Sequence, residues 1–139
     1  MKLLTVAQAV SDASMEIGIT QIPITIVMGT GDQDVAQMGA LLSAVAGELL
    51  LDPPYRDELG DGNWLSNNDG TIFKSRPTSD DDLSLFDPRL VVDGLKYRFL
   101  KAKSLEYGEE QRDFITRQNK LAARNAPVID LNSDVGRVQ

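Results

Sequence analysis

The sequence predicts a mostly α-helical domain: a four-helix bundle with a small β-hairpin or loop insertion between helices two and three, and an extended C-terminal arm. Four stretches place apolar residues at helical spacing, and each is bounded by a capping residue, a glycine or a proline. The stretch between the second and third is rich in glycine and asparagine instead. The chain has 139 residues and is 42% hydrophobic, which suits one core and is too short for two domains.

The first helix is predicted over residues 6–17. Thr5, with Gln8 three residues later, has the pattern of a capping box, and Gly18 is a typical stop. The apolar side chains of this helix share one face: Val6, Ala9, Val10, Ala13 and Ile17. We expect an extended connector over residues 19–28, because Pro23 would remove a donor from any central strand.

The second helix is predicted to run to about residue 50. Thr30 with Gln33, or Asp32 as an alternative cap, begins it, and the Asp-Pro-Pro run at 52–54 ends it. One face is apolar, formed by Val35, Met38, Leu41, Leu42, Val45 and Leu49. A second face is small, formed by Ala36, Ala40, Ser43, Ala44 and Gly47. Small side chains let another helix approach closely, so the pattern predicts a helix buried on two sides, within the bundle or against a neighbouring subunit.

Residues 55–86 are predicted to form the insertion. Two short apolar runs, one beginning at Trp64 and one ending at Phe73, flank Asn68-Asp69-Gly70, a sequence typical of a hairpin turn. Trp64, Phe73 and Phe86 are expected to form a small core that pins the hairpin, with a partner-binding patch as the alternative.

The third helix is predicted from the Asp87 cap and Pro88 to about residue 107. It carries two apolar stripes, one of Val91, Leu95, Phe99 and Ala102 and one of Leu90, Tyr97 and Leu105. Either this helix is central within the subunit, or one stripe faces another chain. Val91, Leu95 and Phe99 are therefore candidate residues for a subunit or portal interface.

The fourth helix is predicted over residues 109–124, with acidic residues first and basic residues last, the order that the helix dipole favours. It ends the helical domain at about residue 126 and is followed by a tail over 127–139. Val128, Ile129 and Leu131 in this tail have no local face to enter. Docking on another subunit, which makes them candidate interface residues, and simple disorder both remain open.

Charge and composition argue against most chemical functions. The net charge of −7 repels a phosphate backbone, and the chain contains no cysteine and no histidine, which removes disulfides, thiolate nucleophiles and the commonest general base. We expect no catalysis, no metal and no cofactor. No stretch of about 18 consecutive apolar residues and no signal peptide is present, so we expect neither secretion nor a membrane partner.

Three local motifs have simpler explanations than ligand binding. The Gly-Thr-Gly-Asp run at 29–32 lacks the further residues of a phosphate loop and is interpreted as helix capping. The aspartates at 80–82 lack calcium-loop spacing and are interpreted as a solvated loop. Four cations of the third helix are interpreted as salt bridges or an interface rim: Lys96, Arg98, Lys101 and Lys103.

Three stretches resemble the head-to-tail adaptor, or connector, proteins of tailed bacteriophages. They are TVAQAVSDASMEIGI at residues 5–19, TGDQDVAQMGALLSAVAGELL at 30–50, and DPRLVVDGLKYRFLKAKSLEYGEEQRDFITRQNKLAARN at 87–125. Together they cover about half of the chain. The "DP" helix start, the "EYG" helix end and the following "D-F-x-x-x-x-N" helix carry the likeness.

The resemblance implies a virion protein of the neck, assembled in the host cytoplasm. Such proteins form a homo-oligomeric ring, typically of twelve subunits, beneath the portal protein and above the tail or nozzle proteins. The ring surrounds DNA that passes without sequence-specific binding, and a C-terminal arm contacts the portal. The alternatives are another neck component such as a stopper, an unrelated helical interaction module, a DNA-binding packaging subunit, or a small carboxylate-based enzyme.

Overall fold

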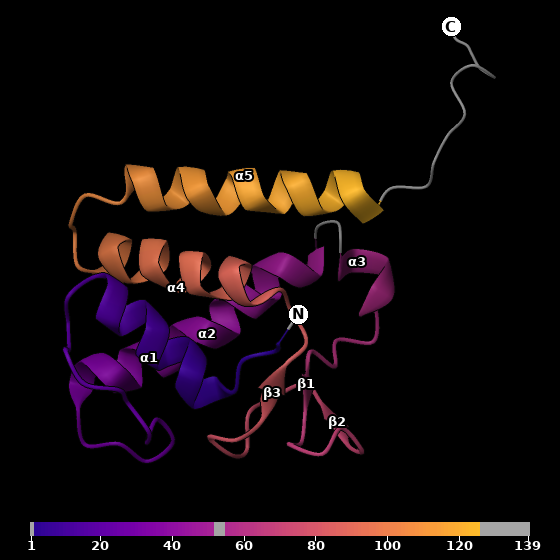
Figure 1. Cartoon of the computed structure of the whole chain (residues 1–139), viewed down its shortest axis with the longest axis horizontal. Helices are drawn as coiled ribbons and strands as arrows, with labels where there is room; N and C mark the ends of the chain where they lie inside the picture. Colours follow the sequence, from indigo (N-terminus) through magenta and orange to yellow (C-terminus); the bar gives the residue numbers. More distant parts are fainter. Residues whose placement is uncertain (1, 52–54, 126–139) are drawn as a thin grey trace, which may run out of the picture.

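The structure is a computed structural model that describes residues 2–51 and 55–125. Its helices are α1 (Val6–Glu16), α2 (Gln33–Leu51), α3 (Tyr55–Glu58), α4 (Pro88–Ala102) and α5 (Gly108–Asn125). Its strands are β1 (Leu65–Ser66), β2 (Phe73–Lys74) and β3 (Leu83–Ser84). The described chain is thus mostly helical with a small antiparallel sheet, as predicted (Figure 1).

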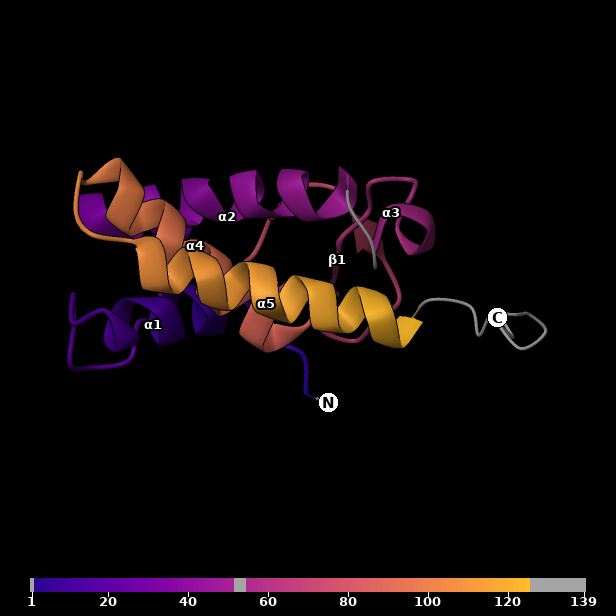
Figure 2. The same ribbon diagram turned by 90° about the horizontal axis from the view of Figure 1, so that it is seen from above.

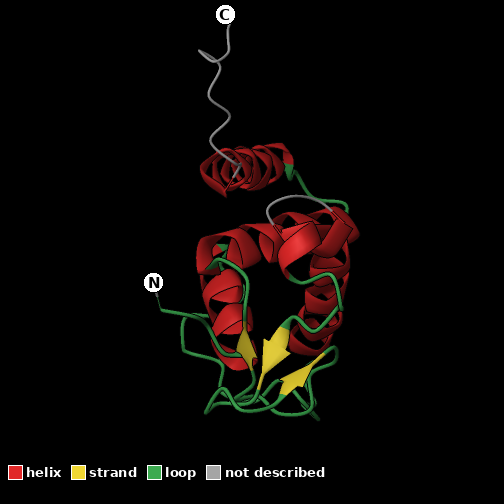
Figure 3. Cartoon of the chain, turned by 90° about the vertical axis from the view of Figure 1, so that its right-hand side faces the viewer, coloured by secondary structure: helices red, strands yellow, loops and turns green. Residues whose placement is uncertain are grey.

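Helix α4 is the centre of the fold. It packs against α1, α2 and α5, whereas the main contacts of α5 are with α4 alone. Figure 3 shows α5 as a separate outer layer and the sheet on the opposite side of the helices, and Figure 2, seen from above, shows α5 crossing over α4. Gly94 lies where three helices meet, because a Cβ atom there would be 2.9 Å from both Phe114 Cε1 on α5 and Val45 Cγ1 on α2.

Short polar contacts begin the helices where the sequence predicts. The capping box of α1 is confirmed: Gln8 N–H donates to Thr5 Oγ1 at 3.1 Å, and Thr5 N–H donates to Gln8 Oε1 at 3.0 Å. Of the two caps considered for α2, Asp32 accepts hydrogen bonds from helix N–H groups, those of Asp34 and Val35, whereas Thr30 Oγ1 accepts from Asp32 N–H before the helix. Helix α2 therefore begins at Gln33.

Two helices end in the same left-handed cap. Gly18 has φ +82° after α1, and Ile19 N–H donates to Ser14 O at 2.9 Å. The predicted end of the third helix near residue 107 is wrong, because Ser104 adopts φ +59° and Leu105 N–H donates to the carbonyl of Leu100. A serine rarely adopts this conformation, so its sequence does not signal the stop. The early stop leaves Leu105 exposed.

The predicted hairpin is confirmed and extended. Strands β1 and β2 pair antiparallel with Leu65 opposite Lys74, and the Asn67 side-chain oxygen accepts from Thr71 N–H at 2.8 Å to close the loop. Strand β3 and the short helix α3 are additional to the prediction. Strand β3 pairs with the other edge of β1, which gives the order β2-β1-β3.

An aromatic cluster joins the sheet to the helices. The rings of Trp64 and Phe86 stack at 5.7 Å, and Tyr55 meets the edge of Phe86 at 4.8 Å. Trp64 Nε1 donates to Ser75 O at 2.9 Å. The small-core interpretation is thus confirmed for Trp64 and Phe86, but it is wrong for Phe73, which is 57% exposed because its strand position faces solvent.

The aspartates at 80–82 are not simply a solvated loop. The Asp82 carboxylate is buried and accepts from Lys74 Nζ and Thr78 N, both at 2.8 Å. Asp80 Oδ1 accepts from the N–H groups of Val27 and Met28, which anchors the connector before α2. Of the three, only Asp81 is exposed. These carboxylates organise turns by accepting backbone hydrogen bonds, a role that charge count alone does not reveal.

Candidate interaction surfaces

The predicted interface stripe of the third helix lies in the core of the subunit. Val91 and Leu95 are fully buried and Phe99 is 4% exposed. Helix α4 is therefore central within the subunit, and the prediction that this stripe faces another chain is wrong. The reason is that α1, α2 and α5 surround α4 on several sides. The other predicted interface residues, Val128, Ile129 and Leu131, lie outside the described residues.

A surface that remains open is the small face of α2. We define the outer face of α2 as Ala36, Ala40, Ser43 and Gly47, all of which are exposed. The opposite face of the same helix is in the core, formed by Val35, Met38, Leu42, Val45 and Leu49. Within one subunit, therefore, only one side of α2 is buried. The sequence predicts that its second side is buried as well, and a contact that covers the outer face would have to come from outside the described residues.

The space around each helix glycine shows whether the glycine is needed for packing within the subunit. A Cβ atom at Gly39 would lie 2.8 Å from Val27 Cγ1, and one at Gly94 would meet Phe114 and Val45, so both glycines are required inside the subunit. A Cβ atom at Gly47 would meet nothing within 4 Å. Because a mid-helix glycine costs about 0.5–1 kcal/mol relative to alanine, Gly47 has a cost that the fold of this subunit does not explain.

Apolar residues continue this surface toward the connector. A hollow of about 250 Å³ lies beside the N-terminal half of the outer face, with Met28, Ala36, Ala40 and Pro77 in its lining. Leu51, at the other end of α2, is 73% exposed.

Helix α2 is the one described helix long and apolar enough to span a membrane, with a mean hydropathy of 1.4, but buried core helices share this property. Its inner face belongs to the core, so the unusual feature is the outer face.

A second surface is a cleft of about 560 Å³, which we call the α3–α5 cleft. It is bounded by α3, by the first turn of α4 and by the last turns of α5. Its lining consists of Tyr55, Glu58, Leu85, Asp87, Pro88, Arg89, Arg117, Leu121 and Arg124.

Asp87 organises one wall of this cleft. It is buried, it caps α4 through Leu90 N–H, and it accepts from Arg117 Nη2 at 2.8 Å and Nε at 3.1 Å. Its own N–H donates to Tyr55 Oη at 2.6 Å. Burial raises the pKa of the Asp87 carboxyl, but the hydrogen bonds from Arg117 and Leu90 lower it by more, so its pKa lies below the usual value. Asp87 and Arg117 are therefore both charged at neutral pH.

Two further clusters fasten α4 to its neighbours. Arg89 donates to both carboxylate oxygens of Glu16, at 2.9 and 2.6 Å, and Lys96 donates to Glu16 at 2.9 Å, so these contacts join α4 to α1. Arg89 also donates to Asp93 within α4. The hydrogen bond from Arg89 is the main reason that the pKa of Glu16 is lowered. Salt bridges were one of the two roles expected for the basic residues of this helix, and Lys96 forms them.

The second cluster joins α4 to α2. Tyr97 Oη donates to Glu48 Oε1 at 2.7 Å, and Arg98 donates to the same oxygen. Burial, reinforced by the Glu48 carboxylate, raises the pKa of Tyr97 to about 12. Lys103 reaches Asp34 at 3.3 Å, whereas Lys101 lies over the Tyr107 ring. Arg98 and Lys103 therefore also form the expected salt bridges.

The sequence did not predict the α3–α5 cleft. Asp87 is 32 positions from Tyr55 and 30 positions from Arg117 in the chain, and each of the three has an ordinary local role. Over residues 2–51 and 55–125, no group of three or more aspartates and glutamates is placed to hold a metal ion. Comparisons with family models, with curated proteins and with solved structures give no match for this chain.

Proposed function

We propose that this chain is a structural subunit of the neck of a tailed bacteriophage, which assembles as a ring beneath the portal, joins head to tail and lines the DNA channel. The order of elements supports this proposal: two helices, a small β insertion, and two further helices followed by a tail. The loose likeness of the three quoted segments to adaptor proteins points in the same direction.

The observation that carries the proposal is the open space at Gly47. A glycine in the middle of a helix, in a row with Ala36, Ala40 and Ser43, allows a neighbouring backbone to approach closely. The exposed side chains of Met28 and Leu51 extend this surface with apolar area that a monomer leaves in water. A subunit that repeats around a ring would bury this area against its neighbour.

The charge of the chain is consistent with a channel for DNA. A net charge of −7 per subunit, repeated around a ring, repels phosphates and lets a duplex slide instead of adhering. The same charge disfavours the alternative of a DNA-binding packaging subunit.

The test is the mass of the purified chain, alone and with its cognate portal protein, by light scattering and negative-stain microscopy. We expect a closed ring that forms alone or on the portal. A chain that stays monomeric at all concentrations and is not retained by the portal would contradict the proposal.

The tail gives a second, separate test of the same proposal. We propose that residues 127–139 attach the ring to the portal, because burying three apolar side chains of this size stabilises a contact by about 1.5–3 kcal/mol each. Deleting 127–139 should leave the helical circular dichroism spectrum unchanged and weaken portal attachment. Equal attachment of the deleted and full-length chains would show that the tail is not the anchor.

A further inference from the structure

The α3–α5 cleft combines an apolar floor with a positively charged rim. Leu85, Pro88 and Leu121 contribute apolar surface, and Arg117 and Arg124 reach the cleft from α5. Its volume of about 560 Å³ falls in the range of ligand pockets, roughly 300–1,000 Å³. The cleft shares no residue with the outer face of α2, so a ligand in the cleft does not require ring assembly.

The polar groups of the cleft offer hydrogen-bond donors without matching acceptors. Tyr55 is 7% exposed, and its hydroxyl oxygen is used to accept from Asp87 N–H, but among the described residues no acceptor meets its own proton. Arg117 contacts Asp87 through Nε and Nη2, which leaves the two hydrogens of Nη1 for another acceptor. A hydroxyl that lines the cleft and has an unused proton can donate it to a ligand oxygen.

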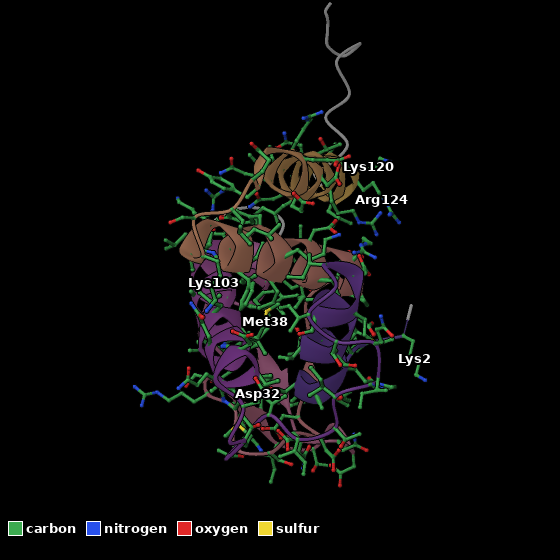
Figure 4. All side chains as sticks on the ribbon, turned by 90° about the vertical axis from the view of Figure 1, so that its left-hand side faces the viewer. Lys2, Asp32, Met38, Lys103, Lys120 and Arg124 are labelled. Carbon is green, nitrogen blue, oxygen red and sulfur yellow. The ribbon has the colours of Figure 1, made fainter. Side chains whose placement is uncertain are left out.

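The charge around the cleft favours an anion. Between Phe114 and Asn125, helix α5 contains no acidic residue but carries Arg117, Lys120 and Arg124. Figure 4 looks along α5 and shows Lys120 and Arg124 on the same side of the helix. Arg117 and Arg89 are already paired with carboxylates, whereas Arg124 contacts no carboxylate among the described residues.

One group in the cleft opposes an anion. Glu58 lines the cleft and is exposed, and it forms no ion pair with any described residue. The lining holds three arginines, but two of them are already neutralised: Arg117 by Asp87, and Arg89 by Glu16 and Asp93. Arg124 is the lining arginine that contacts no carboxylate among the described residues. Arg124 and the unused Nη1 of Arg117 are therefore the groups through which the cleft would attract an anion, against the single opposing charge of Glu58.

From these observations we propose that the α3–α5 cleft binds a short acidic segment of a partner protein. A carboxylate of that segment accepts from Arg124, from Arg117 Nη1 and from the Tyr55 hydroxyl, and an adjacent apolar side chain rests on Leu85 and Leu121. A protein segment fits better than nucleic acid, because the cleft admits a few side chains at most and the rest of the subunit repels a chain of phosphates.

The experiment measures the fluorescence anisotropy of a labelled six-residue peptide that alternates aspartate and leucine, titrated with the full chain at about 50 mM salt. Arg124→Gln should weaken binding by about five- to tenfold, because it removes a charge-assisted contact from an exposed residue. Glu58→Gln should strengthen binding by about two- to fivefold, since it removes the opposing charge.

The matched control is Arg112→Gln, which makes the same charge change on the exposed surface of α5 at its other end. It should change binding less than twofold. Equal weakening by Arg112→Gln and Arg124→Gln, or no effect of Arg124→Gln, would overturn the proposal. So would equal binding of the same peptide with asparagine in place of aspartate, tighter binding of a single-stranded oligonucleotide, or no binding of the aspartate peptide.

Discussion

Replacing Gly47 by alanine should have opposite effects on the subunit and on its assembly. In the isolated subunit the new methyl group enters open space, since a Cβ atom there has no neighbour within 4 Å. The substitution removes the backbone freedom of a mid-helix glycine, which is worth about 0.5–1 kcal/mol. For a chain of this length that gain corresponds to a rise in Tm of about 2–5 °C. In a ring, the same methyl group would hold the neighbouring backbone away.

The assay pairs thermal unfolding of the monomer with the mass of the assembly, and uses Gly94→Ala as its control. A Cβ atom at Gly94 would lie 2.9 Å from Phe114 and Val45, so that variant should lose about 1–3 kcal/mol through overpacking. Gly47→Leu should remain folded and assemble less than Gly47→Ala. If Gly47→Ala lowers the Tm of the monomer, the space at Gly47 is not open. If both Gly47 variants assemble like the wild type, the outer face of α2 is not a contact between subunits.

Three further predictions concern the core and the buried carboxylates. Val91→Asp or Phe99→Asp should cost about 3–5 kcal/mol and abolish the helical circular dichroism signal; a folded variant that only fails to assemble would contradict the central position of α4. Asp87→Asn should cost about 1.5–3 kcal/mol at pH 7. Because the native pKa of Asp87 is lowered, this difference is fully present above about pH 4 and should shrink below it, and an equal difference at pH 3 would argue against the Arg117 pair. Asp82→Ala should destabilise more than Asp82→Asn in urea unfolding, since asparagine keeps an acceptor for the turn; equal losses would contradict that role.

Local signals in the sequence determined most of the fold. The capping box at Thr5, the Asp87 cap before Pro88 and the left-handed Gly18 are each decided by neighbours within four residues, so their outcome can be read from the chain. The hairpin around Gly70 follows from the same kind of short-range chemistry. The sequence also showed that α2 has a small second face, because helical spacing alone places Ala36, Ala40 and Gly47 together.

Tertiary structure decided what each apolar face contacts. Helical spacing says that Val91 and Phe99 share a stripe, but only the positions of α1, α2 and α5 determine that this stripe is core while the outer face of α2 stays open. The α3–α5 cleft likewise joins Tyr55, Asp87 and Arg117 across distant segments, so no local pattern encodes it. Caps and turns depend on contacts between neighbours in the chain. Burial and the pairing of charges depend on how whole helices pack, and the spacing of residues along a single helix does not specify that packing.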